Sequence, residues 1–161
     1  PSEAEWEYAC RAMPSPPTPL STGEGSVYPP FHFGETITTD LANYDGVHET
    51  YGSYGKGPKG VDRQTTTPVN HFHPLANAFA LCDLHGNVLE WCLDHWHDSY
   101  EGAPTDGSPW LTENPESARV IRGGSWFNIP RYCRSAYRYN NYPGDRVDDI
   151  GFRVVCEAPG L

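Results

Sequence analysis

The sequence predicts one α+β domain over residues 1–161, built from few helices, several short antiparallel strands and long loops. Helical periodicity of apolar residues occurs once, near the N-terminus, whereas short runs of alternating apolar and polar residues recur in the second half. The 16 prolines and 16 glycines favour turns and loops between those runs. A chain of 161 residues has room for one hydrophobic core, and an aromatic content of 13% argues against disorder.

The helix is expected at residues 2–13. Ser2 followed by Glu5 is a capping box, in which each side chain accepts the backbone N–H of the other residue. An apolar stripe at helical spacing consists of Trp6, Cys10 and Met13. Pro14 ends the pattern, and residues 14–30 are rich enough in proline and glycine to predict an exposed loop or insertion.

Short strands are expected where apolar residues alternate with polar ones or gather in brief runs. The expected strands are 31–33, 78–81, 88–93, 118–122, 132–138 and 152–156. Polar composition predicts loops at 98–117 and 139–149. Trp91 and Trp126 are expected in the core, because large aromatic rings gain most from burial.

The charge of the chain excludes several classes of partner. Lys and Arg number 11 and Asp and Glu number 21, so the net charge is −10, and neither nucleic acid nor an anionic membrane surface is expected as a partner. The absence of a run of 18 apolar residues argues against a membrane-spanning helix. The polar, acidic first residues predict no signal peptide and a cytoplasmic location.

Cysteine and histidine spacing gives little support for a metal site. The five cysteines, at positions 10, 82, 92, 133 and 156, form no CxxC pair, which excludes a zinc ribbon. Reduced, mostly buried thiols are favoured, and one structural disulfide stays open. The pairs His71/His73 and His95/His97 have the period-2 spacing of metal ligands on a strand, but solvent-facing histidines are the favoured interpretation.

The segment DLHGNVLE at 83–90 has two interpretations of equal weight on spacing alone. In one, Asp83, Asn87 and Glu90 surround a glycine turn and supply the hard oxygen ligands that calcium prefers. In the other, the segment is an Asx-type turn followed by an edge strand. No GxSxG elbow is present, so the sequence does not predict a nucleophile of that type.

Several motifs resemble the formylglycine-generating-enzyme/sulfatase-modifying-factor superfamily. They are PSEAEWEYACRA at 1–12, ANYDG at 42–46, TTPV at 66–69, HGNVLEW at 85–91, RVIRGGSW at 119–126, CRSAYR at 133–138 and GFRVV at 151–155. The resemblance implies a C-type-lectin-like α+β fold, with the N-terminal part of the usual domain absent from this chain.

The resemblance also has implications for metals. The family's calcium ligands map to Asp83, Gly86, Val88 and Glu90, with Asn43 and Tyr44 for a second site. At that second site Val61 stands where the family has an aspartate. The enzymes bind copper with two cysteines, but the first position here is Asn128, which leaves Cys133 as a single thiolate. Calcium is therefore the implied ion, and neither copper nor iron is expected.

A closer resemblance is to the variable proteins of diversity-generating retroelements, with a variable region here at about 119–156. In such proteins AAY codons become NNY codons, which exclude Lys, Glu, Gln, Met and Trp. Thirteen positions between Trp126 and Gly151 lie outside the fixed framework, and none holds an excluded residue type, an outcome expected by chance about one time in twenty. These thirteen variable positions are Phe127, Asn128, Ile129, Tyr132, Tyr139, Asn140, Asn141, Tyr142, Gly144, Asp145, Val147, Asp148 and Asp149.

The resemblance predicts a receptor-like ligand-binding domain without catalytic activity. Tyrosine and phenylalanine at the variable positions are typical of binding surfaces, and one contiguous exposed patch is expected there. Because the patch is aromatic and acidic, a variable ligand, most plausibly protein, is the expected partner. An upstream effector domain, such as a kinase or protease, is common in related proteins. The alternative function is a formylglycine-generating-type oxidase that acts on a cysteine or thiol substrate.

Overall fold

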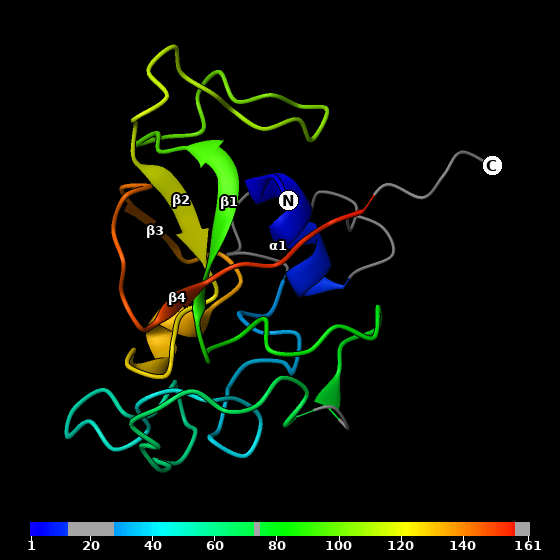
Figure 1. Ribbon diagram of the computed structural model, residues 1–161. Coiled ribbons are helices and arrows are strands. Elements are labelled where there is room, and N and C mark those ends of the chain that lie inside the picture. Colours follow the sequence, from blue (N-terminus) through cyan, green and yellow to red (C-terminus); the bar gives the residue numbers. More distant parts are fainter. Residues whose placement is uncertain (13–27, 73–74, 157–161) are drawn as a thin grey trace.

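A four-stranded sheet with one α-helix on its face organises the part of the chain that the structure describes (Figure 1). The computed structural model describes residues 1–12, 28–72 and 75–156. In chain order the elements are α1 (Glu3–Arg11), β1 (Leu89–His95), β2 (Arg119–Arg122), the 3₁₀ helix η2 (Pro130–Cys133), β3 (Arg138–Asn141) and β4 (Ile150–Gly151). The predicted α+β class is confirmed. In these ranges no helix is long and apolar enough to cross a membrane.

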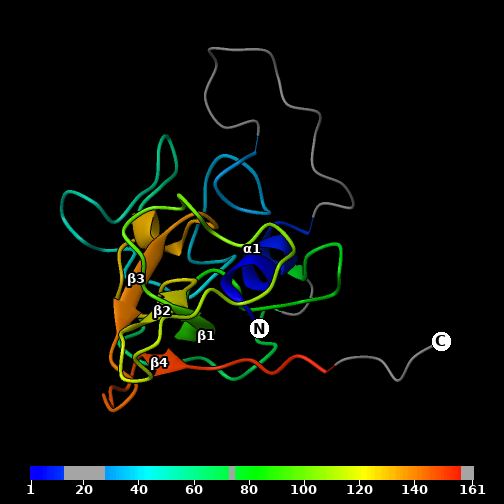
Figure 2. The same cartoon turned by 90° about the horizontal axis from the view of Figure 1, so that it is seen from above.

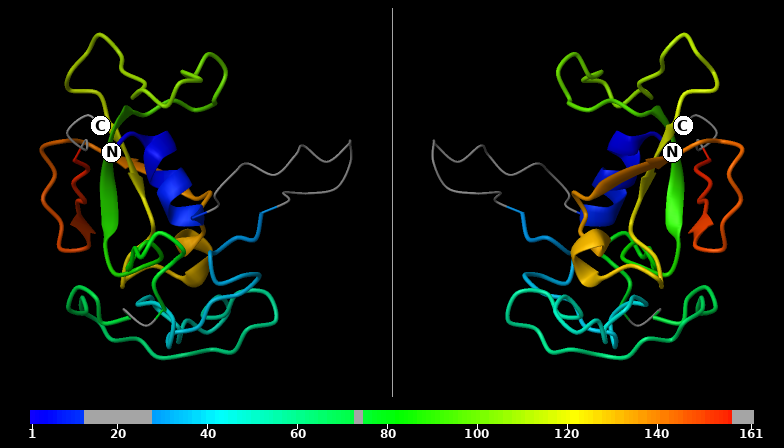
Figure 3. Two further views of the ribbon diagram at one scale, coloured as in Figure 1. Left: turned by 90° about the vertical axis from the view of Figure 1, so that its right-hand side faces the viewer. Right: turned by 90° about the vertical axis from the view of Figure 1, so that its left-hand side faces the viewer.

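The strand order is β3-β2-β1-β4, which Figure 2 shows from above. β2 is antiparallel to both β1 and β3, whereas β4 is parallel to β1. Ile121 lies opposite Trp91 on one side and Tyr139 on the other. Because side chains alternate between the faces of a sheet, Val120 and Cys92 point toward α1. Figure 3 shows α1 on one side of β1 and β2 and the β3–β4 connection on the other.

The helix begins as the sequence predicts. The hydroxyl of Ser2 accepts the N–H of Glu5 at 3.2 Å, and the Glu5 carboxylate accepts the N–H of Ser2 at 2.8 Å. This capping box satisfies two of the N–H groups that a helix start leaves unpaired. Trp6 and Cys10 are buried against the sheet. Met13 and most of the predicted loop lie outside the described residues.

Two hydrophobic clusters form the core. The cluster between α1 and the sheet consists of Trp6, Cys10, Leu84, Cys92 and Val120. The second cluster consists of Phe31, Ile37, Ala42, Tyr44 and Cys133. Cys133 is the last residue of η2, so the second cluster anchors the segment that carries the first variable positions.

A buried guanidinium ties α1 to the sheet. The Arg122 side chain has no exposed surface and forms salt bridges with Glu3 and Glu7 of α1. It also donates to the carbonyl of Ser135 at 2.8 Å and to the carbonyl of Tyr137. An unpaired buried charge is strongly destabilising, so these partners must keep their places together. The helix, β2 and the segment after η2 are thereby held as one unit.

The strand predicted at 132–138 is wrong. Residues 130–133 form η2, and the next strand begins only at Arg138 and continues to Asn141. The first three residues of the loop expected at 139–149 therefore belong to β3. Pro130 is compatible with the first position of a helical turn, where no N–H is needed. The carbonyls after η2 bind the Arg122 side chain, so they are not available to pair with a neighbouring strand.

The other strand predictions have mixed outcomes. The strands at 88–93 and 118–122 are confirmed as β1 and β2. The run at 78–81 is a turn, because the Asn77 side chain accepts two backbone N–H groups within it. At 31–33 the structure has a single bridge in place of a strand.

The strand predicted at 152–156 is also wrong. β4 ends at Gly151, and the next residues have apolar side chains in solvent, with Phe152 77% and Val154 80% exposed. They line a groove of about 580 Å³ beside β1. Parallel pairing between β4 and β1 covers two residues only, so little holds this segment as a strand.

The core tryptophan is not one of the two that were expected. Trp91 and Trp126 are half-buried, whereas Trp6 is 1% exposed. Trp6 packs between helix and sheet, and its indole N–H donates to the Glu90 carboxylate at 2.6 Å. A buried indole N–H needs such an acceptor, and Glu90 supplies it to Trp6.

Replacing Trp6 by Ala is expected to lower the free energy of unfolding by about 3–5 kcal/mol, because the lost ring leaves a cavity between α1 and the sheet. Tyr139→Ala removes a ring that is 53% exposed and is expected to cost about 0.5 kcal/mol or less. Urea unfolding measured by circular dichroism compares the two variants. Equal losses would contradict the assignment of Trp6 to the core and Tyr139 to the surface.

Candidate ligand-binding surface

A double glycine after β2 directs the chain toward the variable positions. Gly123 and Gly124 have φ angles of +96° and +73°, which other residues rarely adopt. A Cβ atom on Gly124 would lie 2.7 Å from the Sγ of Cys133, closer than real atoms approach. The two glycines therefore allow residues 125–133 to fold back across the end of the sheet.

The turn that follows is closed by two of the thirteen variable positions. The Ser125 N–H donates to Oδ1 of Asn128 at 3.1 Å, and the Ser125 hydroxyl donates to Oδ2 of Asp149 at 2.9 Å. Ser125 itself is fully buried. Asn128 and Asp149 thus support the framework as well as the surface.

None of the thirteen variable positions is buried. Seven are exposed, namely Phe127, Tyr139, Tyr142, Gly144, Asp145, Val147 and Asp148. Six are half-buried, namely Asn128, Ile129, Tyr132, Asn140, Asn141 and Asp149. Side chains at such positions can change without leaving a cavity in either hydrophobic cluster.

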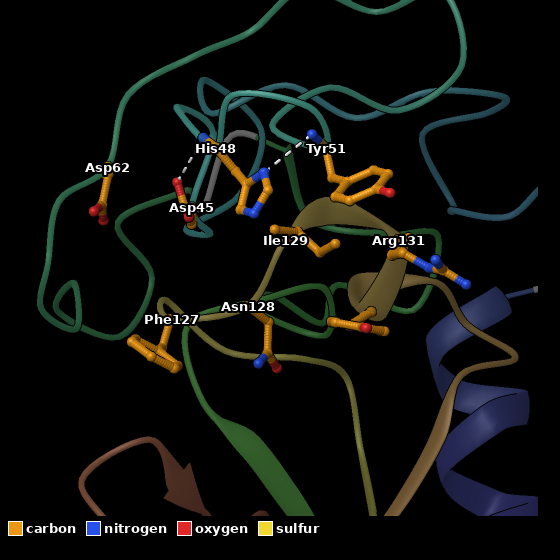
Figure 4. A pocket seen from close by; sticks show the side chains of 9 residues that line it. Asp45, His48, Tyr51, Asp62, Phe127, Asn128, Ile129 and Arg131 are labelled. Carbon is orange, nitrogen blue, oxygen red and sulfur yellow. Dashed lines mark hydrogen bonds between the residues drawn. The ribbon is translucent and has the colours of Figure 1, made fainter.

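A first hollow of about 510 Å³ lies between residues 127–132 and the loop at 45–62 (Figure 4). One side is formed by the variable residues Phe127, Asn128, Ile129 and Tyr132. The other side, the constant wall, is formed by Asp45, His48, Tyr51 and Asp62. Figure 4 shows Asp62 at one end of the hollow and Arg131 at the other.

A second hollow of about 310 Å³ adjoins the first, since Asn128 and Tyr132 line both. Its other variable residues are Tyr139, Asn141, Val147 and Asp149. Its fixed residues are Leu89, Ile121, Tyr137 and Ile150. Eight of the thirteen positions therefore line one continuous surface with two hollows, which we call the variable surface.

The remaining five positions line neither hollow. Asn140 lies opposite Val120 in the β2–β3 register, so its side chain points to the face of the sheet that α1 covers. Four exposed positions of the β3–β4 connection line neither hollow, namely Tyr142, Gly144, Asp145 and Asp148. The variable surface is thus smaller than the set of variable positions.

Three tyrosines form a row along the second hollow. The fixed Tyr137 lies between two variable residues, with ring centroids 4.7 Å from Tyr132 and 6.5 Å from Tyr139. Burial raises the pKa of Tyr137, so its phenol stays protonated at neutral pH. Such a row offers rigid apolar faces together with hydroxyl groups that donate or accept hydrogen bonds.

Hydrogen bonds to the main chain hold the variable surface in place. The N–H of Asp45 donates to the carbonyl of Asn128 at 2.9 Å, which joins the two sides of the first hollow. His85 Nδ1 binds the carbonyl of Cys133 at 2.7 Å, and His85 Nε2 accepts the N–H of His32 at 3.2 Å. This pairing places the ring proton on Nδ1. Because these bonds use the backbone carbonyls of Asn128 and Cys133, they persist when the side chains at the variable positions change.

The carboxylate of the predicted calcium loop is already neutralised by a protein cation. Glu90 accepts Arg153 at both oxygens, at 2.7 and 3.0 Å, and also accepts the indole N–H of Trp6. The carbonyl of Gly86 accepts the N–H of Val88 at 3.0 Å, inside the same loop. The charge of Glu90 is therefore balanced by Arg153, which argues against a calcium ion at this carboxylate in this arrangement.

The protein satisfies the other implied calcium ligands only in part. Oδ2 of Asp83 accepts the N–H of Asn70 at 3.1 Å, whereas Oδ1 of Asp83 and Oδ1 of Asn43 are buried without a hydrogen-bond partner among the described residues. The carbonyl of Asn43 accepts the N–H of Asn87 at 2.7 Å, and Tyr44 is fully buried in the second cluster. Among the described residues no group of three or more His, Cys, Asp or Glu side chains is placed to hold a metal ion.

The histidine pairs and the cysteines have structural surroundings. His95 is buried, contrary to the expectation of a solvent-facing side chain, and binds the hydroxyl of Thr112 at 2.7 Å. His97 stacks on Trp110 with centroids 3.6 Å apart. His73 lies outside the described residues. The buried thiols are Cys10, Cys82, Cys92 and Cys133.

The sheet with its sparse helices and long loops defines a C-type-lectin-like α+β domain of the formylglycine-generating-enzyme type. The family model of the sulfatase-modifying factor enzyme 1-like domain matches residues 1–158. The chain belongs to this family.

Two curated relatives are similar over almost the whole chain. The formylglycine-generating enzyme of Mus musculus is 31% identical over 98% of this chain and 38% of its own length. The inactive Cα-formylglycine-generating enzyme 2 of Bos taurus is 31% identical over 98% of this chain and 44% of its own length. The chain therefore spans less than half the length of these relatives.

Two solved structures have a similar fold. PvdO from Pseudomonas aeruginosa is 41% identical, with a TM-score of 0.65 over 94% of this chain and 49% of that one. Treponema denticola variable protein 1 is 28% identical, with a TM-score of 0.58 over 94% of this chain and 45% of that one. The latter is a variable protein, which agrees with the class that the C-terminal motifs resemble.

The burial of His85, a residue that no spacing pattern in the sequence marks, predicts a pH dependence of stability. Burial lowers its pKa to about 3 from an ordinary value of 6.5, so the folded protein keeps it neutral while the unfolded chain binds a proton. The contribution of neutral His85 to the free energy of unfolding is complete above pH 6.5. As the pH falls from 6.5 to about 3, this contribution is expected to be lost, by up to about 1.4 kcal/mol per pH unit. Urea unfolding across this range measures the slope. The slope of His85→Gln should be shallower, and an equal slope would contradict the assignment.

Removal of calcium is expected to leave the melting temperature unchanged, because Arg153 already pairs with Glu90. A calcium site with a free ion concentration a thousandfold above its Kd would stabilise the fold by about 4 kcal/mol. Thermal unfolding in excess chelator and in millimolar calcium, with magnesium as the control, measures the difference. An increase in melting temperature with calcium alone would instead support the calcium loop that the resemblance implies.

Proposed function

We propose that this chain is a receptor-like ligand-binding domain whose variable surface is diversified by a retroelement. The observation that carries the proposal is that eight of the thirteen variable positions line two adjoining hollows and none of the thirteen is buried. The similarity to Treponema denticola variable protein 1 supports it. The proposed partner is a variable ligand of protein nature.

The framework explains how such a surface tolerates change. Arg122 binds two carbonyls of the segment between η2 and β3, and His85 binds the carbonyl of Cys133. None of these bonds uses a variable side chain. A substitution at Tyr139 or Val147 therefore alters contacts with a ligand while the backbone that presents them stays in place.

The surroundings of Cys133 argue against the alternative, a formylglycine-generating-type oxidase. Its thiol is fully buried in the second cluster, and burial raises its pKa far above the ordinary value, which disfavours the thiolate that metals bind. Asn128 occupies the position of the family's first catalytic cysteine and its side chain closes the Ser125 turn. A copper(I) site of two thiolates is not supported by this arrangement.

Sequencing of this region from a population of cells tests the proposal. Variation is expected at the codons of the thirteen variable positions, next to a reverse transcriptase and an asparagine-rich near-repeat of residues 119–156. The intervening fixed segment, CRSAYR at 133–138, is the internal control and should not vary. Variation spread equally over that segment and the thirteen codons, or the lack of the near-repeat, would contradict diversification.

The same protein incubated with copper and a cysteine-containing peptide tests the absence of catalysis. No conversion of the cysteine is expected above the level of copper without protein, since Cys133 lacks a partner thiol at position 128. Multiple turnovers that depend on the Cys133 side chain would favour the oxidase.

A further inference from the structure

The constant wall of the first hollow lies outside the reach of diversification. Its residues, Asp45, His48, Tyr51 and Asp62, all come from the 45–62 loop, and none belongs to the thirteen variable positions. If the proposed function holds, every variant of this domain presents a different variable side against the same constant wall. The chemistry of that wall therefore sets a requirement that all ligands share.

Backbone pairing brings the two carboxylates of the constant wall to the same hollow. The N–H of Gly46 donates to the carbonyl of Val61 at 3.1 Å, and the N–H of Gly60 donates to the carbonyl of Gly46 at 2.8 Å. Asp45 and Asp62 directly adjoin these paired residues. The Asp45 N–H donates to the Asn128 carbonyl, which keeps this end of the wall against the variable side.

One oxygen of each carboxylate is held by the backbone, and the other has no hydrogen-bond partner in the part of the chain that the structure describes. Oδ1 of Asp45 accepts the N–H groups of Val47 and His48, and Oδ1 of Asp62 accepts the N–H of Gln64. Within the described ranges neither Asp45 nor Asp62 forms a salt bridge, in contrast to the paired carboxylates around α1. Two oriented carboxylates therefore remain to bind a cation from outside.

At one end of the hollow, an exposed aromatic ring adds to the preference for a cation. Figure 4 shows Phe127 on the same end of the hollow as Asp62, and its ring is 69% exposed. An aromatic face beside carboxylates attracts ammonium and guanidinium groups. The one cationic lining residue, Arg131, lies at the opposite end in Figure 4, where it stacks over Tyr132. The chain's net charge of −10 adds a long-range attraction for cations.

His48 gives the wall a donor with a fixed direction. Its Nδ1 accepts the N–H groups of Thr50 and Tyr51 at 3.3 and 3.2 Å, so in the neutral ring the proton is on Nε2. Figure 4 shows the imidazole projecting from the loop toward Ile129, so Nε2 faces the interior of the hollow. A ligand carbonyl next to a bound cationic side chain has a donor available there.

We infer that the constant wall is an anchor for a primary ammonium or guanidinium group, supplied by a lysine or arginine side chain on the surface of a protein ligand. Asp45 and Asp62 bind the cation, and Phe127, where the ring is retained, covers its alkyl chain. The variable residues of the first hollow then contact the ligand residues that surround the anchored side chain. This inference rests on the proposed function and names the chemical class of its ligands.

Titration with a small probe tests the anchor without knowledge of the natural ligand. N-acetyl-lysine methylamide is expected to shift the backbone NMR signals of the 45–62 loop, with weak, millimolar affinity, whereas the uncharged norleucine analogue is expected not to do so. Asp62→Asn keeps the oxygen that accepts the Gln64 N–H and should weaken binding by up to about fivefold, the upper end of what a surface ion pair contributes. Asp98→Asn is the matched control and should not change binding, because Asp98 is exposed, is not a variable position, lines neither hollow, and the amide keeps an oxygen for the Trp96 indole N–H.

Each outcome bears on the anchor separately from the proposed function. Equal shifts with the lysine and norleucine probes, no shift with lysine, or unchanged binding in Asp62→Asn would overturn the anchor. In each of those cases, sequence variation confined to the thirteen codons would still support the proposed function. Thermal unfolding of both Asn variants checks that the fold is retained.

Discussion

The buried Arg122 guanidinium is the interaction on which the rest of the structure depends. It lies over the Trp6 ring at 5.1 Å, pairs with Glu3 and Glu7, and donates to two carbonyls beyond η2. A charge with no exposed surface is tolerated only when its partners surround it, so helix, sheet and the segment leading to β3 must assemble together. The same contact explains why that segment is not a strand, since its carbonyls are taken by a side chain.

This arrangement separates the atoms that build the fold from those that face a ligand. Arg122 and His85 bind carbonyls of the segment 133–137, and Asp45 binds the carbonyl of Asn128. Carbonyls are present whatever the side chain, so the surface can change its chemistry without losing its support. A binding domain with variable side chains requires this kind of framework.

Two variable positions depart from that separation. Asn128 and Asp149 close the turn at the buried Ser125 through their side chains, so residues without a suitable acceptor would leave polar groups of Ser125 unsatisfied. Diversification at these positions therefore acts on stability as well as on recognition. The constant wall of the first hollow has no such double role, because its residues come from the 45–62 loop, which the variable region does not include.

The sequence by itself determined the features that depend on near neighbours. The capping box of Ser2 and Glu5 placed the helix, alternation placed β1 and β2, and polar composition indicated that the positions after Trp126 are not buried. Only the tertiary structure decided that Arg122 is buried, that Glu90 pairs with Arg153, and that the 45–62 loop faces the variable segment. Local patterns report interactions across one turn or one strand, whereas these partners are separated by tens of residues. Such polar residues reach the interior only because the fold brings the opposite charge or acceptor to them.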